Sequence, residues 1–118
     1  MSLYTYKFTA TRVVDGDTVD GIIDLGFRLF QRVRVRMAGY DAPETWRPKS
    51  EEEREAGKRV TLFLEELLAG KDLTIVSHKI DIYNRCIGEL FIDGESVNQM
   101  VMAYIVESSL EKEQFYLA

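Results

Sequence analysis

Short runs of β-branched and aromatic residues, broken by turn residues, fill the first third of the chain. The runs lie at residues 6–14, 18–25 and 28–38. Asp15-Gly16 and Gly26 separate them, which is typical of turns between consecutive strands. The pattern therefore predicts a meander of three strands in this region.

Apolar and basic residues alternate along the third predicted strand. Val33, Val35 and Met37 share one face, with the period of two that a half-buried strand requires. The opposite, outward face carries Arg32, Arg34 and Arg36. Three arginines on an exposed strand face are more often a solvated surface or a safeguard against edge-to-edge pairing than a phosphate site. The alternation alone therefore leaves their role open.

A helix is expected after the meander. Ser50 and Glu53 form a capping box, and Gly70 suits the C-terminal cap. Between them, apolar residues keep helical spacing at Val60, Phe63, Leu64, Leu67 and Leu68. This apolar stripe should cover the open end of the sheet.

Two more strands and a second helix complete the pattern. The strand-like runs lie at residues 72–79 and 86–92, and the helix is expected from Ser96, with Gln99 as its capping partner. This order predicts an α+β, mainly β fold, compatible with a five-stranded OB-type barrel and two helices. Because the 118 residues contain no repeat and no linker, we expect a single domain over residues 1–118.

The composition is that of an ordinary soluble globular protein, with 46% hydrophobic and 30% charged residues. Charges break every apolar run before the roughly 18 residues that a membrane-spanning helix needs. The opening MSLYTYKFTA lacks the apolar core of a signal peptide. A cytoplasmic location without membrane contact is therefore the default expectation, and a secreted one stays open where an export signal has been removed. The single cysteine, Cys86, excludes an internal disulfide.

The net charge of −5 is unevenly divided along the chain. Residues 1–49 hold eight Lys/Arg against six Asp/Glu, whereas residues 50–118 hold seven against fourteen. A phosphate-directed function is therefore expected in the first half. Salt screens the overall repulsion from nucleic acid, so a local arginine cluster can dominate at contact distance.

Two aspartates lie at the ends of predicted strands. Asp17 belongs to the turn "VVDGDTVD", in which Gly16 is expected to adopt a backbone conformation that a side chain would resist. Asp41 belongs to the loop that leaves the third strand. Two hard oxygen ligands would suit Ca²⁺ or Mg²⁺. For either aspartate alone, a capped turn is the simpler interpretation.

Three motifs taken together resemble the staphylococcal nuclease (thermonuclease) family. "VVDGDTVDG", "RVRMAGYDAPE" and "DIYNR" occur in the family's order and spacing, and the resemblance covers about residues 5–106. It implies a calcium-dependent OB-fold phosphodiesterase. It also implies that the calcium ligands are Asp17, Asp41 and the backbone carbonyl of Ala42.

The same resemblance implies the catalytic residues. Arg36 and Arg85 correspond to the two catalytic arginines, Glu44 to the catalytic glutamate, and Tyr83 to a tyrosine that lines the nucleotide pocket. Arginine suits phosphodiester chemistry because its planar fork holds two oxygens where negative charge develops and never loses its proton. Glu44 would either accept the proton of the attacking water or orient that water, and both roles stay open.

The function implied is that of a calcium-dependent endonuclease, a hydrolase of low sequence specificity that cleaves DNA, with RNA as an open second substrate. The alternative is a non-catalytic OB-fold module that binds nucleic acid or a protein. After the second helix the likeness ends, because "VESSLEKEQFYLA" replaces the family's loop and further helix. We therefore expect that C-terminal helix to be shortened or absent. The oligomeric state is not predicted, and a partner or second copy closing the site stays open.

Trp46 lies two residues after Glu44, where an aromatic ring could stack on a base or pack on the first helix. We expect it to pack.

Overall fold

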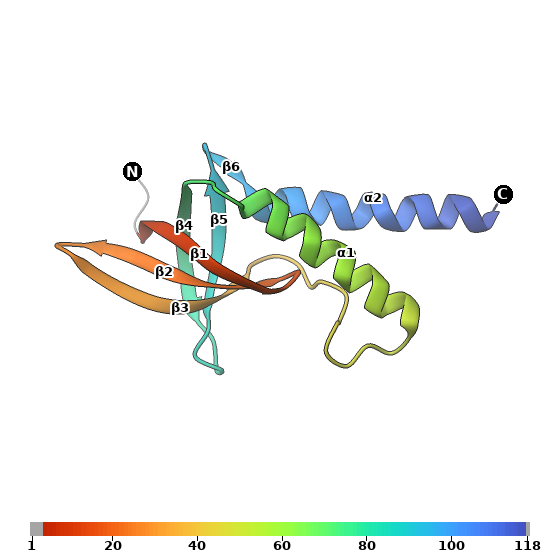
Figure 1. The fold of residues 1–118 in the computed structure, drawn as a ribbon, viewed down its shortest axis with the longest axis horizontal. Coiled ribbons are helices and arrows are strands. Elements are labelled where there is room, and N and C mark those ends of the chain that lie inside the picture. The colour runs from red at the N-terminus through yellow and green to blue at the C-terminus, as the bar shows by residue number, and fades with distance from the viewer. Residues whose placement is uncertain (1–3, 118) are drawn as a thin grey trace.

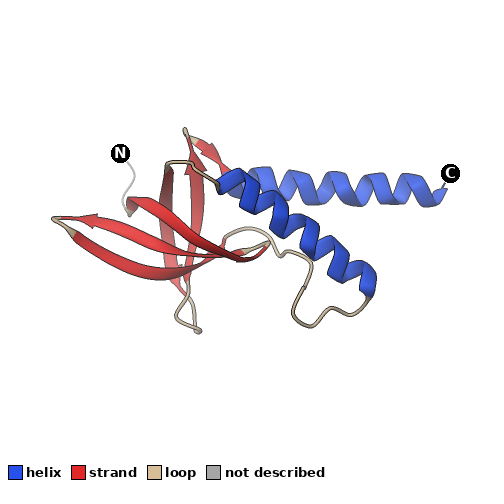
Figure 2. Ribbon diagram, viewed as in Figure 1, coloured by secondary structure: helices blue, strands red, loops and turns tan. Residues whose placement is uncertain are grey.

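The computed structural model describes residues 4–117, with side chains described up to Ser108. The strands are β1 (Thr5–Asp15), β2 (Thr18–Gly26), β3 (Leu29–Met37), β4 (Leu73–Ile80), β5 (Cys86–Ile92) and β6 (Glu95–Ser96). The helices are α1 (Glu51–Leu68) and α2 (Val97–Leu117). Figure 1 shows both helices on the same side of the strands, and Figure 2 shows how short the connecting loops are apart from the one before α1.

The sheet is a closed barrel. The strand order is β3-β2-β1-β4-β5-β6, and a parallel pairing of β3 with β5 closes the first five strands on themselves. The meander β1-β2-β3 is antiparallel, as the sequence predicts. The fold is therefore the predicted five-stranded OB-type barrel with two helices. The two-residue β6 was not predicted, because so short a segment carries no periodic signal.

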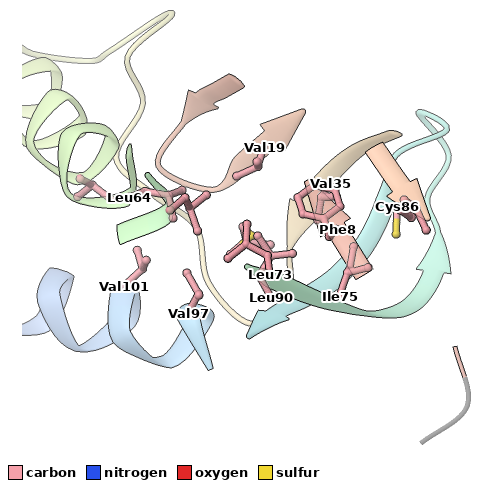
Figure 3. Close-up of a cluster of buried hydrophobic side chains, with 14 residues drawn as sticks. Phe8, Val19, Val35, Leu64, Leu73, Ile75, Cys86, Leu90, Val97 and Val101 are labelled. Carbon is pink, nitrogen blue, oxygen red and sulfur yellow. The ribbon is translucent and has the colours of Figure 1, made fainter. Parts of the chain in front are cut away.

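The core lies inside the barrel and under the two helices (Figure 3). Val35 and Met37 are fully buried, whereas Arg34 and Arg36 face outward, so the predicted alternation of β3 is confirmed. Leu64 of α1 and Val97 of α2 have no exposed surface. Burying each such side chain contributes about 1.5–3 kcal/mol, which stabilises the barrel that carries the outer face.

Both helices begin where the capping pattern places them. Ser50 Oγ accepts a hydrogen bond from the backbone N–H of Glu53 at 3.1 Å, and α1 ends at the C-cap Ala69 followed by Gly70, whose φ is +68°. The Glu53 carboxylate does not return to Ser50. It accepts from the backbone N–H of Lys49 at 3.3 Å instead.

The second helix joins the core through one face. Ser96 Oγ accepts from the Gln99 N–H at 3.2 Å, which confirms the predicted start of α2. Tyr104 stacks on Phe63 of α1 with 4.1 Å between ring centroids. The C-terminal end of α2 lies far from the barrel (Figure 1). Within residues 4–117, no helix is both long and apolar enough to cross a membrane.

Candidate active site

Arg36 and Asp17 meet at one end of β3 because of strand register. Arg36 pairs with Thr18 across β2, and the Met37 N–H donates to the Asp17 carbonyl at 2.8 Å. The Arg36 Nη2 lies 3.5 Å from Asp17 Oδ2 and also donates to Asp41 Oδ1. Its Nη1 donates to the carbonyl oxygens of Met37 and Tyr40, both at 2.9 Å. The guanidinium is therefore held from both sides in a single orientation.

Asp17 is fixed just as firmly. Its Oδ2 accepts from the Ala42 N–H at 2.8 Å and its Oδ1 from the Thr18 hydroxyl at 3.0 Å. Burial raises the pKa of Asp17, but a hydrogen bond from Asp15, the Ala42 N–H and the charge of Arg36 together outweigh it, so the pKa lies below its ordinary value. The carboxylate is consequently ionised, and only 15% of its side chain is exposed.

Gly16 is needed for space rather than for an unusual backbone angle. A Cβ at this position would lie 2.5 Å from Val60 Cγ1 and 2.7 Å from Ala42 Cβ, and Gly16 does not have a positive φ. The expectation that Gly16 adopts a conformation closed to other residues is therefore wrong. The turn at Gly16 instead packs between α1 and the loop after β3, and this packing sets the position of Asp17.

Asp15 and Tyr40 also support this end of the site, and sequence reasoning missed both. Asp15 Oδ1 accepts from the Asp17 N–H at 3.1 Å, and the Tyr40 hydroxyl donates to the Gly16 carbonyl at 2.7 Å. Burial and then the hydrogen bond with the Asp17 carboxylate raise the pKa of Asp15 to about 6. The sequence Asp15-Gly16-Asp17 places a second carboxyl group beside Asp17 and so indicated Asp15, whereas no local pattern indicated Tyr40.

Arg85 is presented by the turn between β4 and β5. Asp81 organises this turn, because its Oδ1 accepts from the backbone N–H groups of Tyr83 at 2.9 Å and Arg85 at 2.8 Å. Its Oδ2 accepts from Arg85 Nε at 2.8 Å. Tyr83 is 73% exposed, and its ring centroid lies 5.3 Å from Arg85 Cζ. Asp81 is therefore a positioning residue for the second predicted arginine.

Arg36, Asp41 and Arg85 line one open pocket of about 410 Å³. The remaining lining comes from the segment between Met37 and Tyr40 and from Ile87. The parallel pairing of β3 with β5 brings the two arginines to the same place, since Arg36 is opposite Ile87. The structure thus gathers residues that lie 49 positions apart in the sequence around one cavity.

Glu44 and Trp46 lie outside this pocket. No hydrogen bond or ion pair within residues 4–108 joins the Glu44 carboxylate to either arginine, and its backbone N–H donates to Glu53 at 3.3 Å. A Cβ at Gly57 of α1 would lie 2.7 Å from the Pro43 carbonyl, so the loop backbone itself contacts the helix. Trp46 is 80% exposed, so the expectation that it packs on α1 is wrong; its neighbours Pro43 and Thr45 are the loop residues that lie against Gly57.

The oxygen donors beside Arg36 are of the kind that a hard divalent cation prefers. Among the described residues, no three His, Cys, Asp or Glu side chains are grouped as a ready metal site, and Asp17 and Asp41 both contact Arg36. Two observations nevertheless fit a cation. Besides burial, repulsion between the Asp15 and Asp17 carboxylates contributes to the raised pKa of Asp15, and the Asp41 side chain is 92% exposed.

The structure is thus a closed OB-type barrel that gathers two arginines and a carboxylate around one outer pocket. Residues 34–112 match the family described as "Staphylococcal nuclease homologue", and the chain belongs to that family.

Relatives with nuclease names support this membership. An "Uncharacterized endonuclease" of Escherichia coli O157:H7 is 33% identical over 92 residues, which are 77% of this chain and 52% of the relative. The "Probable staphylococcal-like nuclease CAN1" of Oryza sativa subsp. japonica is 31% identical over 69% of this chain and 25% of its own length. The "Micrococcal nuclease" of Shigella flexneri is 27% identical over 73% and 42%. The chain thus spans about half or less of each relative.

Proposed function

We propose that this protein is a nuclease that hydrolyses phosphodiester bonds of DNA, and also of RNA, with Ca²⁺ as its metal. The observation that carries the proposal is the pocket shared by Arg36, Asp41 and Arg85, in a chain whose relatives bear nuclease names. Two fixed guanidiniums facing one cavity suit a ligand whose negative charge grows during reaction.

The two arginines would bind the phosphate oxygens. Arg36 is aimed by two backbone carbonyls and two carboxylates, and Arg85 is aimed by Asp81, so neither needs to reorganise as charge develops. Such preorganisation makes each donor more effective in the transition state than a mobile side chain would be. Tyr83, beside Arg85, is in reach of the adjoining nucleotide.

Asp17, Asp41 and the Ala42 carbonyl would hold the metal. When bound, Ca²⁺ would supply Lewis acidity and help place the attacking water. Arg36 Nη2 donates to Asp41 Oδ1, so a carboxylate that would hold the metal also orients the first arginine. Glu44 would accept the water's proton or orient the water from the loop that follows Ala42.

Low sequence specificity follows from the chemistry of the pocket. Its polar groups address phosphate, and phosphate contacts carry no sequence information directly. Binding should depend strongly on salt, because the arginines displace counterions from the nucleic acid, and the net charge of −5 opposes association at long range.

The test is a grid of labelled single- and double-stranded DNA and RNA incubated with Ca²⁺, Mg²⁺ or chelator. We expect cleavage with Ca²⁺, none with chelator, and loss of turnover in Glu44→Gln with calcium binding retained. Undiminished turnover in Glu44→Gln would remove this glutamate from the mechanism. Absence of cleavage in every condition, with binding retained, would instead make the protein a non-catalytic binding module.

A further inference from the structure

The outward face of β3 carries a row of side chains that leads away from the pocket. The cross-strand pairs with β2 are Asp24–Phe30, Ile22–Arg32, Asp20–Arg34 and Thr18–Arg36. Alternate residues of a strand share a face, so the row consists of Phe30, Arg32, Arg34 and Arg36. Six steps of about 3.4 Å separate Phe30 from Arg36, so the row is about 20 Å long. We call this set the β3 row.

A hollow of about 500 Å³ lies beside the middle of the β3 row. Its lining includes Asp20, Ile22, Arg32 and Arg34 from the two strands and Asn84 from the turn that also carries Arg85. Most of the lining comes from β2 and β3, with Thr11, Ile80 and Cys86 added from β1, β4 and β5. Strands 2 and 3 and the β4–β5 loop are the elements that OB-type barrels use for oligonucleotides and oligosaccharides. Its lining residues Arg34 and Asn84 are close in sequence to Arg36 and Arg85, but the hollow is separate from the pocket that these two arginines line.

The hollow is locally positive in a protein that is acidic overall. Arg34 donates to both carboxylate oxygens of Asp20, at 2.7 and 3.0 Å, which neutralises the only acidic side chain among the described residues that line it. Arg32 has no hydrogen bond or ion pair within residues 4–108 and is exposed. The Arg32 guanidinium is therefore exposed and available to a phosphate, next to Arg34, which Asp20 holds in place.

The far end of the row is aromatic. Phe30 is 65% exposed and Phe27, at the hairpin tip, is 97% exposed. Phe27 and Arg28 form a two-residue turn in which both have positive φ, 54° and 64°, a region that residues with a side chain rarely adopt. Aromatic rings beside arginines form the platform on which the bases of a single strand stack.

We propose that the β3 row and its hollow bind a single-stranded segment of nucleic acid, with Phe30 stacking on a base and Arg32 contacting a phosphate, so that the strand runs into the pocket at Arg36. This inference rests on the proposed function for the nature of the ligand. A lipid surface or a second copy of the chain would use the apolar tip, but neither accounts for a row of arginines that leads to the pocket.

The test measures binding of fluorescent oligothymidylates of about 15 and about three nucleotides, in chelator to prevent cleavage. Arg32→Ala and Phe30→Ala are compared with Arg54→Ala and Leu62→Ala, which remove exposed side chains of α1. We expect Arg32→Ala to weaken binding of the long oligonucleotide about threefold to tenfold and to lower the salt slope by about 0.7. Phe30→Ala should weaken it about fivefold or more. Binding of the short oligonucleotide should not change.

The outcomes separate this inference from the proposed function. If the wild type cleaves DNA but Arg32→Ala and Phe30→Ala behave like the α1 controls, the β3 row is not a binding surface. If nothing is cleaved but the two variants still lose affinity for the long oligonucleotide, the surface stands and the nuclease proposal fails. If Phe30→Ala alters only sedimentation or vesicle binding, the tip serves self-association or a lipid surface and the inference is overturned.

Discussion

The two ends of β3 differ in how firmly their side chains are held. At the Met37 end, Arg36 contacts two backbone carbonyls and two carboxylates, and only 16% of its side chain is exposed. At the Leu29 end, Phe30 is 65% exposed and Phe27 almost fully exposed at a turn with positive φ. One strand thus carries a fixed polar site at one end and an open apolar tip at the other.

The two ends of β3 therefore suit two different functions. Stabilising a transition state requires groups that are aimed in advance, whereas stacking on a single strand tolerates adaptable side chains. The fixed end depends on support from elsewhere. Asn98 of α2 is 1% exposed, and its amide donates to the carbonyls of Ala38 and Gly88 while its oxygen accepts from the Leu90 N–H.

The largest effect should come from breaking the fixed end itself. We expect Arg36→Ala to slow cleavage by about a hundredfold to a thousandfold, the size seen when one transition-state donor is removed. Arg36→Lys should recover little, because one ammonium group cannot satisfy all four acceptors. Initial rates on plasmid DNA would show this, with Arg54→Ala as the control. Parental rates in Arg36→Ala would exclude the assigned role.

Removing the support behind the fixed end should lower stability instead. Asn98→Ala deletes three hydrogen bonds, two of them buried, and takes away the side-chain partner of the buried Leu90 N–H, so we expect the free energy of unfolding to fall by about 3 kcal/mol. Urea unfolding followed by circular dichroism measures this, and Gln99→Ala at the neighbouring exposed position of α2 is the control. A loss below about 1 kcal/mol would mean that α2 is anchored by its apolar face alone.

The carboxylates near Arg36 should make stability depend on pH in the metal-free protein. Because the pKa of Asp15 is raised to about 6, its stabilising contribution is complete below about pH 4 and is lost as the pH rises through about 6. The shift corresponds to about 3 kcal/mol, which solvent screening of a half-exposed group reduces to about 1 kcal/mol. Asp15→Asn should remove this loss. The measurement is the free energy of unfolding of both proteins in chelator, below about pH 4 and above about pH 6. Equal pH dependence in both proteins would contradict it.

The smallest effect is expected at the tip, where a gain replaces a loss. Asn-Gly is favoured in two-residue hairpin turns with positive φ, so Phe27→Asn combined with Arg28→Gly should raise the free energy of unfolding by about 0.5 kcal/mol. Thermal unfolding compares the variant with the wild type. A marked destabilisation would show that Phe27 packs in solution, and the two ends of β3 would then be less different than we describe.

Much of the fold could be predicted from local patterns. Runs of β-branched and aromatic residues gave β1, β2 and β3, and the period of two gave the outward face of β3. Ser50 and Ser96 marked the helix starts. All these features depend on residues within a few positions. For the candidate site, three separated motifs pointed to residues of which the structure gathers Arg36, Asp41 and Arg85 around one pocket. The roles of all seven predicted site residues remain predictions.

What the sequence by itself determined is the order of elements and the supply of guanidinium and carboxylate groups at particular strand ends. The tertiary structure alone decided which groups meet. The β3–β5 pairing, the Asn98 bonds to Ala38 and the packing that demands glycine at position 16 all join segments far apart in the chain. Local spacing carries no information about such contacts, because their geometry exists only once the barrel has closed around its core.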